Sequence, residues 1–490
     1  MHAGSEQLLI SAHPFETRMA VLVQGQLVEL HATPTDGESA VGLIALGKVV
    51  RVLPGMQAAF VELGLERPGF LHARDIERVR VNELGATVEP PDIRQLVHEG
   101  QVLPVQVVKD PIASKGARLT TNIALPSRFL VLTPDSEHIG VSQRIVNALE
   151  RDRLRELVRE CATAACLPVG HGFIVRTAAE GACREDLTTD LAALALVWQE
   201  VEARRVRAVA GDVLFRDLPT HIRVLRDLVG PATTSIQVDS AQLHTTVSEF
   251  IATTLPQFAH IVSRAESSEP LFLARGVEQQ IRSALTPRVG LPSGGYLIIE
   301  QTEAMITVDV NTGGFTGADS LEETVYQTNL EAAAVLPRQL RLRNLGGLIV
   351  VDFIDMELPA HRVAVTDELR AGCQSDPARI RVSEMSDFGL VELSRKRTRE
   401  SLARQFCEPC AVCAGSGLVP RPATVAFEVL RALSALINPR QDVVVEAGEP
   451  VIARLLNEDA THLARIAQNL GVTVQLQSVA DGAPGAFELR

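Results

Sequence analysis

A series of apolar segments between residues 296 and 356 constrains the fold of this chain more than any other part of its sequence. YLIIE (296–300) and AMITVDV (304–310) are separated by three residues, which predicts a β-hairpin. A helical pattern follows in LEETVYQTNLEAAAVLPRQLRLRN (321–344). GGLIVVDFIDM (346–356) is almost continuously apolar and predicts a strand buried on both faces. Strands that alternate with a long helix predict a mixed α/β domain.

Two of these predicted strands, 304–310 and 346–356, each carry an aspartate among apolar residues. Asp309 comes near the end of the first, with Asn311 two residues later, and Asp352 interrupts the run LIVVDFI. A carboxylate in a buried strand is costly unless it is paired or binds a cation. Asp309 and Asn311 fall on one side of an extended strand, and two carboxylates with an amide oxygen suit Mg²⁺, which can orient a water and neutralise charge on a phosphodiester. The alternative is that one aspartate caps a helix or pairs with an arginine.

The rest of the sequence predicts several further domains, because 490 residues exceed one ordinary hydrophobic core. Residues 7–33 indicate two strands around a turn, and the short strand-like segments between 39 and 125 indicate a small barrel. Helical spacing dominates from 145 to 210. After residue 420, a compact tail alternates helix, strand, helix and strand.

Composition restricts the classes of protein to which the chain can belong. We find no apolar run of about 18 residues or more, and the N-terminus lacks the pattern of a secretory signal, so we expect a cytoplasmic protein without a membrane span. The net charge of −13 argues at first against a polyanionic partner. Local potential matters more than the total, however, and SRKRTRESLAR (394–404) and RQLRLRN (338–344) are both basic.

Two groups of residues suggest contacts with nucleic acid. Phe60 and Phe70 lie at strand positions beside small and polar residues, with Lys109 at the end of a later strand. Aromatic side chains on a barrel face with cations at its edge bind single strands by base stacking, although isolated phenylalanines more often fill a core. Arg176 and Thr177 stand together at a strand end, where a guanidinium and a hydroxyl could hold a phosphate. Alone, that second signal is weak.

The cysteines favour a metal over disulfides. Seven in a chain of this length are too few for a disulfide scaffold, and Cys407, Cys410 and Cys413 crowd into CEPCAVCAGSGL. The two C-x-x-C spacings suit tetrahedral zinc. No downstream pair completes the site, so three local thiols take a fourth ligand from elsewhere, or two thiols from each of two chains share one ion. Free buried thiols are the remaining alternative.

Several long stretches of the chain follow one another in a recognisable order: RVLPGMQAAFVELG, KGARLTTNIALPSRFLVL, GVSQRI, PSGGYLIIEQTEAMITVDVNTGGFTG, TNLEAA, RNLGGLIVVDFIDM and GLVELSRKRTRES. These collinear stretches resemble the RNase E/G family of bacterial endoribonucleases. The resemblance implies a multidomain α/β (α+β) fold of six parts. They are an RNase-H-like domain split between 1–38 and 216–283, an OB-fold RNA-binding domain (39–125), a 5′-sensor domain (126–215), a DNase-I-like catalytic domain (284–405), a zinc link (406–419) and a small C-terminal α/β domain (420–490).

The resemblance also implies roles for the residues named above. Asp309 and Asp352 would bind the catalytic Mg²⁺, with Asn311 assisting. Cys410 and Cys413 would bind one structural Zn²⁺ together with the same pair of a second subunit, in a dimer or a tetramer. The remaining roles are contacts to single-stranded RNA by Phe60, Phe70 and Lys109, and a 5′-monophosphate pocket formed by Arg176, Thr177, Arg379 and Val131.

The sequence departs from the family pattern at three points. The family usually has proline after the first zinc cysteine, where this chain has Ala411, and Pro409 precedes that cysteine instead. Together with the extra Cys407, this leaves open which thiols bind zinc. Ser127 stands where the family has a glycine beside the phosphate pocket. The scaffold tail of the longer family members, which assembles a degradosome, is expected to be absent.

The implied activity is Mg²⁺-dependent hydrolysis of single-stranded RNA to 5′-phosphate and 3′-hydroxyl products, with a preference for 5′-monophosphorylated substrates. The implied roles are 5′-end maturation of small-subunit ribosomal RNA and mRNA decay. A competing hypothesis is a non-catalytic RNA-binding factor in ribosome assembly. Such a protein would tolerate loss of the carboxylates, yet all three candidate ligands are present. A Mg²⁺ hydrolase acting on DNA or a phosphomonoester is a third hypothesis.

Overall fold

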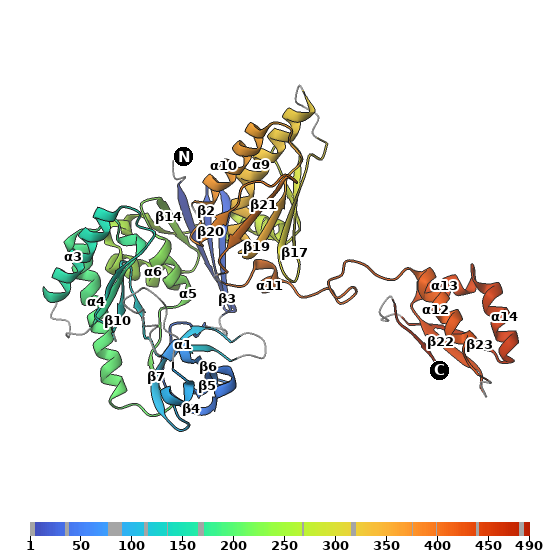
Figure 1. The fold of residues 1–490 in the computed structure, drawn as a ribbon, viewed down its shortest axis with the longest axis horizontal. Helices are drawn as coiled ribbons and strands as arrows, with labels where there is room; N and C mark the ends of the chain where they lie inside the picture. The colour runs from blue at the N-terminus through green and yellow to red at the C-terminus, as the bar shows by residue number, and fades with distance from the viewer. Residues whose placement is uncertain are drawn as a thin grey trace. The chain divides into compact units, whose positions relative to one another are not determined.

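A computed structural model gives the fold of the chain in two compact units, Met1–Thr398 and Arg399–Arg490 (Figure 1). The first unit contains four β-sheets and the second contains one, within the part of the chain that the structure describes. The described residues are 5–34, 39–76, 91–111, 116–134, 136–164, 171–266, 269–314, 320–374, 376–397, 399–437, 441–479 and 485–490.

The first sheet joins the N-terminal segment to strands from the middle of the chain. Its order is β15-β14-β1-β2-β3, and β14 pairs in parallel with β1. Two strands were predicted between residues 7 and 33, and this was wrong, because a tight turn closed by His13 N–H to Glu16 O at 2.8 Å adds a third. The elements are β1 (Glu6–Ala12), β2 (Glu16–Val23), β3 (Gln26–Pro34), β14 (Thr233–Val238) and β15 (Val262–Arg264), with α5 (Thr220–Leu228), α6 (Ala241–Thr254), α7 (Leu271–Ala274) and α8 (Val277–Ala284).

The second sheet is the predicted small barrel. The strand order β4-β5-β6-β8-β7 closes on itself because β4 also pairs with β7, and β13 (Val213–Phe215) adds to β4 from outside. Branched apolar residues such as Val49, Val61 and Leu119 fill the interior. The barrel elements are β4 (Ile44–Leu53), β5 (Ala58–Glu62), β6 (Gly69–His72), α1 (Ala73–Ile76), α2 (Ile93–Leu96), β7 (Val102–Lys109) and β8 (Arg118–Thr120).

A third sheet of four short strands carries two long helices, which agrees with the helical spacing read between 145 and 210. Its strand order is β11-β12-β10-β9, and its core includes Leu154 of α3 and Leu191 of α4. The elements are β9 (Leu125–Pro126), β10 (Leu130–Thr133), β11 (Ile139–Val141), α3 (Ala148–Ala164), β12 (Gly172–Val175) and α4 (Arg184–Arg205).

The fourth sheet, called the carboxylate sheet below, contains Asp309 and Asp352. Its order is β16-β17-β18-β19-β21-β20, and β18 and β19 are its parallel neighbours. The predicted hairpin and long helix are both present; Ser320 accepts the N–H of Glu323 and so starts the helix at its N-cap. The elements are β16 (Arg288–Gly290), β17 (Tyr296–Gln301), β18 (Ile306–Asn311), α9 (Leu321–Leu342), β19 (Gly347–Asp352), α10 (Pro359–Cys373), β20 (Ile380–Val382) and β21 (Leu390–Arg395).

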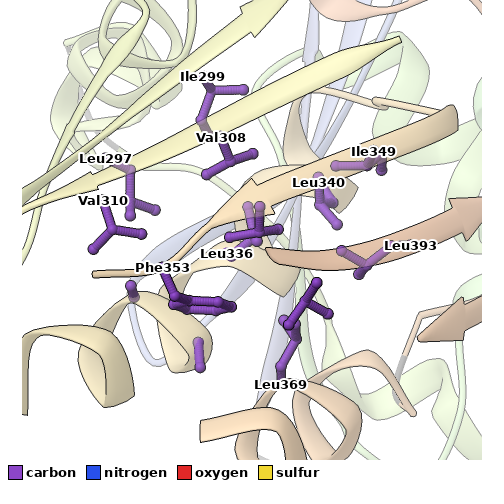
Figure 2. Packing of buried hydrophobic residues seen from close by; sticks show 14 of the residues in the cluster. Leu297, Ile299, Val308, Val310, Leu336, Leu340, Ile349, Phe353, Leu369 and Leu393 are labelled. Atoms are coloured by element: carbon purple, nitrogen blue, oxygen red, sulfur yellow. The ribbon is translucent and has the colours of Figure 1, made fainter. Parts of the chain in front are cut away.

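Helices α9 and α10 cover one face of the carboxylate sheet (Figure 1). Figure 2 shows Leu297 beside Val310 and Ile299 beside Val308, in one cluster with Leu336 of α9. The prediction that 346–356 forms a strand buried on both faces was wrong. Ile349 and Val351 are buried, but Leu348 is 44% exposed and Asp352 is exposed, because both helices lie on the other face. We call that uncovered side the outer face.

The second unit contains the predicted small α/β domain (420–490), whose described residues form one helix and one strand more than expected. Its sheet has the order β23-β22-β24 and packs against α12, α13 and α14. The elements are α11 (Leu402–Phe406), α12 (Pro422–Ser434), β22 (Val443–Ala447), α13 (Glu449–Leu456), α14 (Ala460–Leu470), β23 (Val474–Ser478) and β24 (Phe487–Leu489). Across the described ranges of both units, none of the helices has the length and apolar character to cross a membrane.

Candidate active site

Asp309 and Asp352 stand side by side on the outer face of the carboxylate sheet. They are register partners on the parallel strands β18 and β19, and both side chains are exposed. Asn311, two residues after Asp309, donates its Nδ2–H to Oδ2 of Asp309 at 2.8 Å. Strand periodicity places Asp309 and Asn311 on one side of β18, as their spacing indicated, and the parallel register of β19 brings Asp352 beside Asp309.

Negative charge accumulates at this site, and among the described residues no Lys or Arg forms an ion pair with Asp309 or Asp352. The pKa of Asp352 is raised above its usual value, first by partial burial, then by the charges of Asp309 and Asp355. Within the described residues, no three His, Cys, Asp or Glu side chains converge to hold a metal by themselves. Two carboxylates and an amide nevertheless fit Mg²⁺, which keeps several waters and commonly takes its remaining ligands from a phosphate substrate.

The segment that follows Asp352 is held by two residues that the sequence analysis missed. Asn329 of α9, fully buried, donates its Nδ2–H to Ile354 O at 2.7 Å and accepts the Ile354 N–H at 3.1 Å. Glu322 accepts the N–H groups of Glu357 and Leu358, and its pKa is lowered mainly by the first of these bonds. A polar residue on the apolar side of a predicted helix was the available signal for Asn329.

A glycine shapes the loop that follows β18, the strand of Asp309 and Asn311. Gly313 has φ +59°, and a Cβ there would lie 2.6 Å from the carbonyl oxygen of Gly294. The loop after Asn311 therefore approaches the neighbouring turn more closely than a larger residue would allow.

The residues predicted to bind nucleic acid on the barrel lie in one row across its surface. Phe60 and Phe70 are register partners, both half-buried and outside the barrel core, with ring centroids 6.1 Å apart at 69°. Phe70 pairs with Arg118, and Arg118 pairs with the exposed Lys109. Two aromatic rings are thus followed by two cations, and Arg118 was not predicted. Its guanidinium also contacts Asp75 at 3.0 Å.

Arg176 is fixed by partners from two other parts of the first unit. Its Nη1 donates to Ser127 O at 2.5 Å and to Asp227 Oδ1 of α5 at 2.8 Å. Burial raises the pKa of Asp227. The hydrogen bond from Arg176 and the charge of Arg226 lower it by more, so the net shift of this pKa is downward. The hydroxyl of Ser127, at the position where the sequence departs from the family pattern, donates to the buried Asp190 at 2.5 Å. The hydroxyl is therefore bonded to Asp190, and it is the backbone carbonyl of Ser127 that binds Arg176.

Each of the other predicted pocket residues makes a contact of its own. Thr177 shares a hydrogen bond of 3.0 Å with Ser142, and Val131 pairs across the sheet with Ile174. Arg379, which precedes β20 of the carboxylate sheet, donates to Gln143 at 3.5 Å. Arg144 donates to the carbonyl of Pro377. The loop before β20 thus contacts the segment that follows β11.

Comparison with known proteins identifies the family. Residues 124–398 match the model of the Ribonuclease E/G family, and residues 409–490 match the RNase E/G thioredoxin-like domain. The chain is 43% identical to Ribonuclease G of Salmonella typhimurium over 478 residues, which cover 96% of each chain. The chain belongs to the ribonuclease E/G family. This confirms the predicted family and the predicted enzyme class, an endoribonuclease.

Other relatives show how the match is distributed within the ribonuclease E/G family. Ribonuclease G of Haemophilus influenzae is 43% identical over 460 residues, 93% of this chain and 92% of the relative. Ribonuclease E of Nostoc sp. is 40% identical over 405 residues, 81% of this chain but 57% of the relative. The chain thus matches the ribonuclease G proteins along almost their whole length, but only about half of the longer ribonuclease E.

The cysteine segment lies between α11 and α12 of the second unit. Cys407 and Cys410 are exposed and Cys413 is half-buried. Backbone N–H groups of Gly417 and Gly415 lower the pKa of the Cys413 thiol, so the segment is arranged to favour a thiolate, the form that binds zinc. In the described part of the chain no third metal-binding side chain joins Cys410 and Cys413. A tetrahedral ion here would therefore need ligands from elsewhere.

Proposed function

We propose that this member of the ribonuclease E/G family is a Mg²⁺-dependent endoribonuclease that cleaves single-stranded RNA at the outer face of the carboxylate sheet. The observation that carries the proposal is the register pair of Asp309 and Asp352, exposed side by side with Asn311. A cation between two like charges relieves their repulsion, so the pair favours binding of a divalent ion.

Asp309, Asp352 and Asn311 have different roles at this site. Asp309 and Asp352 would hold the ion, and Asn311 fixes the orientation of the Asp309 carboxylate through its 2.8 Å hydrogen bond. When bound, Mg²⁺ supplies positive charge opposite the reacting phosphodiester and orients the attacking water. Asn329 holds the backbone just beyond Asp352 through two hydrogen bonds. Hydrolysis in this arrangement would leave a 5′-phosphate and a 3′-hydroxyl.

The barrel row would bind the RNA strand away from the cleaved bond. Phe60 and Phe70 offer ring faces for unpaired bases, and Lys109 and Arg118 offer charge for the backbone phosphates. This combination suits single strands, because bases in a duplex are not free to stack on protein rings.

The pocket around Arg176 and Thr177 would bind a 5′-monophosphate, with Val131 at its side and Arg379 completing the positive charge. Arg176 is already oriented by Ser127 and Asp227, so binding the phosphate does not require the guanidinium to be ordered first. This preorganisation supports a preference for 5′-monophosphorylated RNA.

Assembly and cellular role complete the proposal. Cys410 and Cys413 would share one Zn²⁺ with the same pair of a second copy, in a dimer or a tetramer, with Cys407 as an alternative thiol. We propose a cytoplasmic location and roles in 5′-end maturation of ribosomal RNA and in mRNA decay, as expected for a relative of the ribonuclease G proteins.

Cleavage assays on matched oligonucleotides test the proposal. Asp309→Asn and Asp352→Asn are each expected to slow cleavage of a 5′-monophosphorylated oligoribonucleotide at least about a hundredfold, because each removes one charged ligand. Glu300→Gln, which neutralises an exposed carboxylate elsewhere on the outer face, is the matched control and should cleave normally. Wild-type rates in both aspartate variants would refute the site.

The same assay separates the alternative functions. Cleavage of the RNA oligomer but not of the DNA oligomer is the expected result. Equal cleavage of both would indicate a general Mg²⁺ nuclease. Tight RNA binding by the wild-type chain without any Mg²⁺-dependent cleavage would favour the non-catalytic RNA-binding factor.

A further inference from the structure

Arg288 and Tyr296 form a stacked pair on the outer face of the carboxylate sheet. The guanidinium carbon of Arg288 lies 4.0 Å from the centroid of the Tyr296 ring. The two residues come from the neighbouring strands β16 and β17, and their neighbours Val289 and Leu297 point into the core. Alternation along each strand therefore places both side chains on the face that carries Asp309 and Asp352.

Strand register locates this pair directly beside the carboxylate site. Tyr296 is the partner of Asn311, which bonds to Asp309. Arg288 pairs with Ile298, and Ile298 pairs with Asp309. The ring thus stands one strand away from the proposed metal ligands, and the guanidinium lies on its far side.

The polar groups of the pair have no partner among the residues that the structure describes. Among the residues that the structure describes, no carboxylate forms an ion pair with Arg288, and the Tyr296 hydroxyl makes no hydrogen bond. Arg288 is exposed and Tyr296 is half-buried. A purely structural role would leave the guanidinium charge without a function, whereas a flat cation beside a phosphodiester-cleaving site has an evident one.

We propose that Arg288, held flat by Tyr296, binds the nucleotide next to the scissile phosphate, an inference that rests on the proposed endoribonuclease function. The guanidinium plane offers a stacking surface for an unpaired base, and its charge attracts the phosphate backbone. This site is separate from the barrel row, because it belongs to the sheet that carries the carboxylates. It determines how the strand lies at the cleaved bond.

The decisive experiment combines protein variants with a modified substrate. KM and kcat are measured with the full chain on a 5′-monophosphorylated oligoribonucleotide whose cleavage site has been mapped, and on versions with one abasic nucleotide on either side of that site. Arg288→Ala is expected to raise KM about tenfold on the intact substrate, the size typical of one lost base-stacking contact. On the abasic substrate that has already lost this contact, the variant should bind almost as well as the wild-type chain.

Conservative variants distinguish stacking on the guanidinium plane from attraction by its charge. Arg288→Lys keeps the charge, so the salt dependence of KM should remain as in the wild-type chain while most of the stacking affinity is lost. Tyr296→Leu should weaken binding by removing the ring beneath the guanidinium, and Tyr296→Phe should recover the affinity lost in Tyr296→Leu.

Arg282→Ala is the matched control, because it removes an exposed arginine of α8 that carries no resolved ion pair. Equal KM effects of Arg288→Ala and Arg282→Ala, or the same Arg288→Ala effect on intact and abasic substrates, would overturn the proposal.

A change in the native mass of the Arg288→Ala variant would also overturn the proposal, because it would assign the pair to contacts between copies of the chain. The outcome is independent of the cleavage defect in Asp309→Asn, which tests the proposed function alone.

Discussion

Asp309, Asn311 and Asp352 stand on two neighbouring strands of one sheet, whereas the residues predicted to form a phosphate pocket around Arg176 come from separate parts of the chain. Ser127 comes from a turn between two short strands, Asp227 from helix α5, and Arg379 from the loop before an edge strand. The first site is fixed by the backbone of the sheet. The second depends on hydrogen bonds between elements that are distant in sequence.

The two sites also differ in how their charges are balanced. The carboxylates repel one another, and the pKa of Asp352 rises through partial burial and through Asp309 and Asp355. Arg176 instead has a carboxylate partner, Asp227, whose pKa is lowered. The difference fits the proposal that the strand site binds an added cation. Under the same proposal, a phosphate that binds Arg176 would have to share this guanidinium with Asp227 or displace it.

The largest expected effect concerns the loop that carries Arg379. Asp376 accepts two hydrogen bonds from Arg395, at 2.9 and 3.2 Å, and both side chains are only 3% exposed. Asp376→Asn should lower the free energy of opening of β20 and β21 by about 3–5 kcal/mol, because it leaves a buried guanidinium unpaired. Hydrogen exchange of the β20 and β21 amides measures this loss.

Asp367→Asn provides the control for that measurement. Asp367 is 62% exposed and pairs with Arg370 on the surface of α10. Its loss should cost less than about 0.5 kcal/mol. Equal effects of the two variants would contradict the view that the pocket depends on a buried pair.

Arg176→Ala tests whether the assembled pocket senses the RNA end. The preference for a 5′-monophosphate over a 5′-hydroxyl substrate should fall about tenfold, as expected for the loss of a charge-assisted hydrogen bond. Arg155→Ala removes an exposed arginine of α3 and should leave the preference unchanged. Equal loss of activity on both substrates in Arg176→Ala would count against a sensor role.

The smallest expected effect concerns repulsion at the strand site. Without divalent ions, Asp309→Asn should stabilise the first unit by about 0.2–1 kcal/mol, because two like charges no longer face one another across adjacent strands. Added Mg²⁺ should raise the melting temperature of the wild-type chain more than that of the variant. Thermal unfolding in chelator and in Mg²⁺ gives both values; a variant that is less stable in chelator would show that the two charges do not repel.

The sequence predicted the strand site well, because a period of two places Asp309 and Asn311 on one side of β18 without knowledge of the fold. The same reasoning misjudged β19. Leu348 and Val350 are apolar although they lie on the outer face, and composition cannot reveal which side α9 and α10 cover. Tyr296 was missed because only strand register brings it beside Asn311, and Arg288 was missed because only the folded sheet stacks it on Tyr296.

From the residues alone, the phosphate pocket was predicted only as a weak signal at Arg176 and Thr177, and Arg379 and Val131 were added through the family resemblance. Asp227 lies 51 residues after Arg176, and no local pattern connects the two. The buried pair of Asp376 and Arg395 was not identified from the sequence either, because a charged residue in a loop or at a strand end is normally exposed. Contacts between elements of different sheets require the tertiary structure.

The most direct test of the strand site is the single-turnover rate of RNA cleavage as a function of Mg²⁺ concentration, in the wild-type chain and in Asp352→Asn. The wild-type rate should be negligible in chelator and should rise to a plateau as Mg²⁺ is added. Asp352→Asn should remain at least about a hundredfold slower at every Mg²⁺ concentration. Cleavage by the wild-type chain in chelator, or a variant that reaches the wild-type plateau, would contradict the assignment of Asp309 and Asp352 as the metal-binding centre.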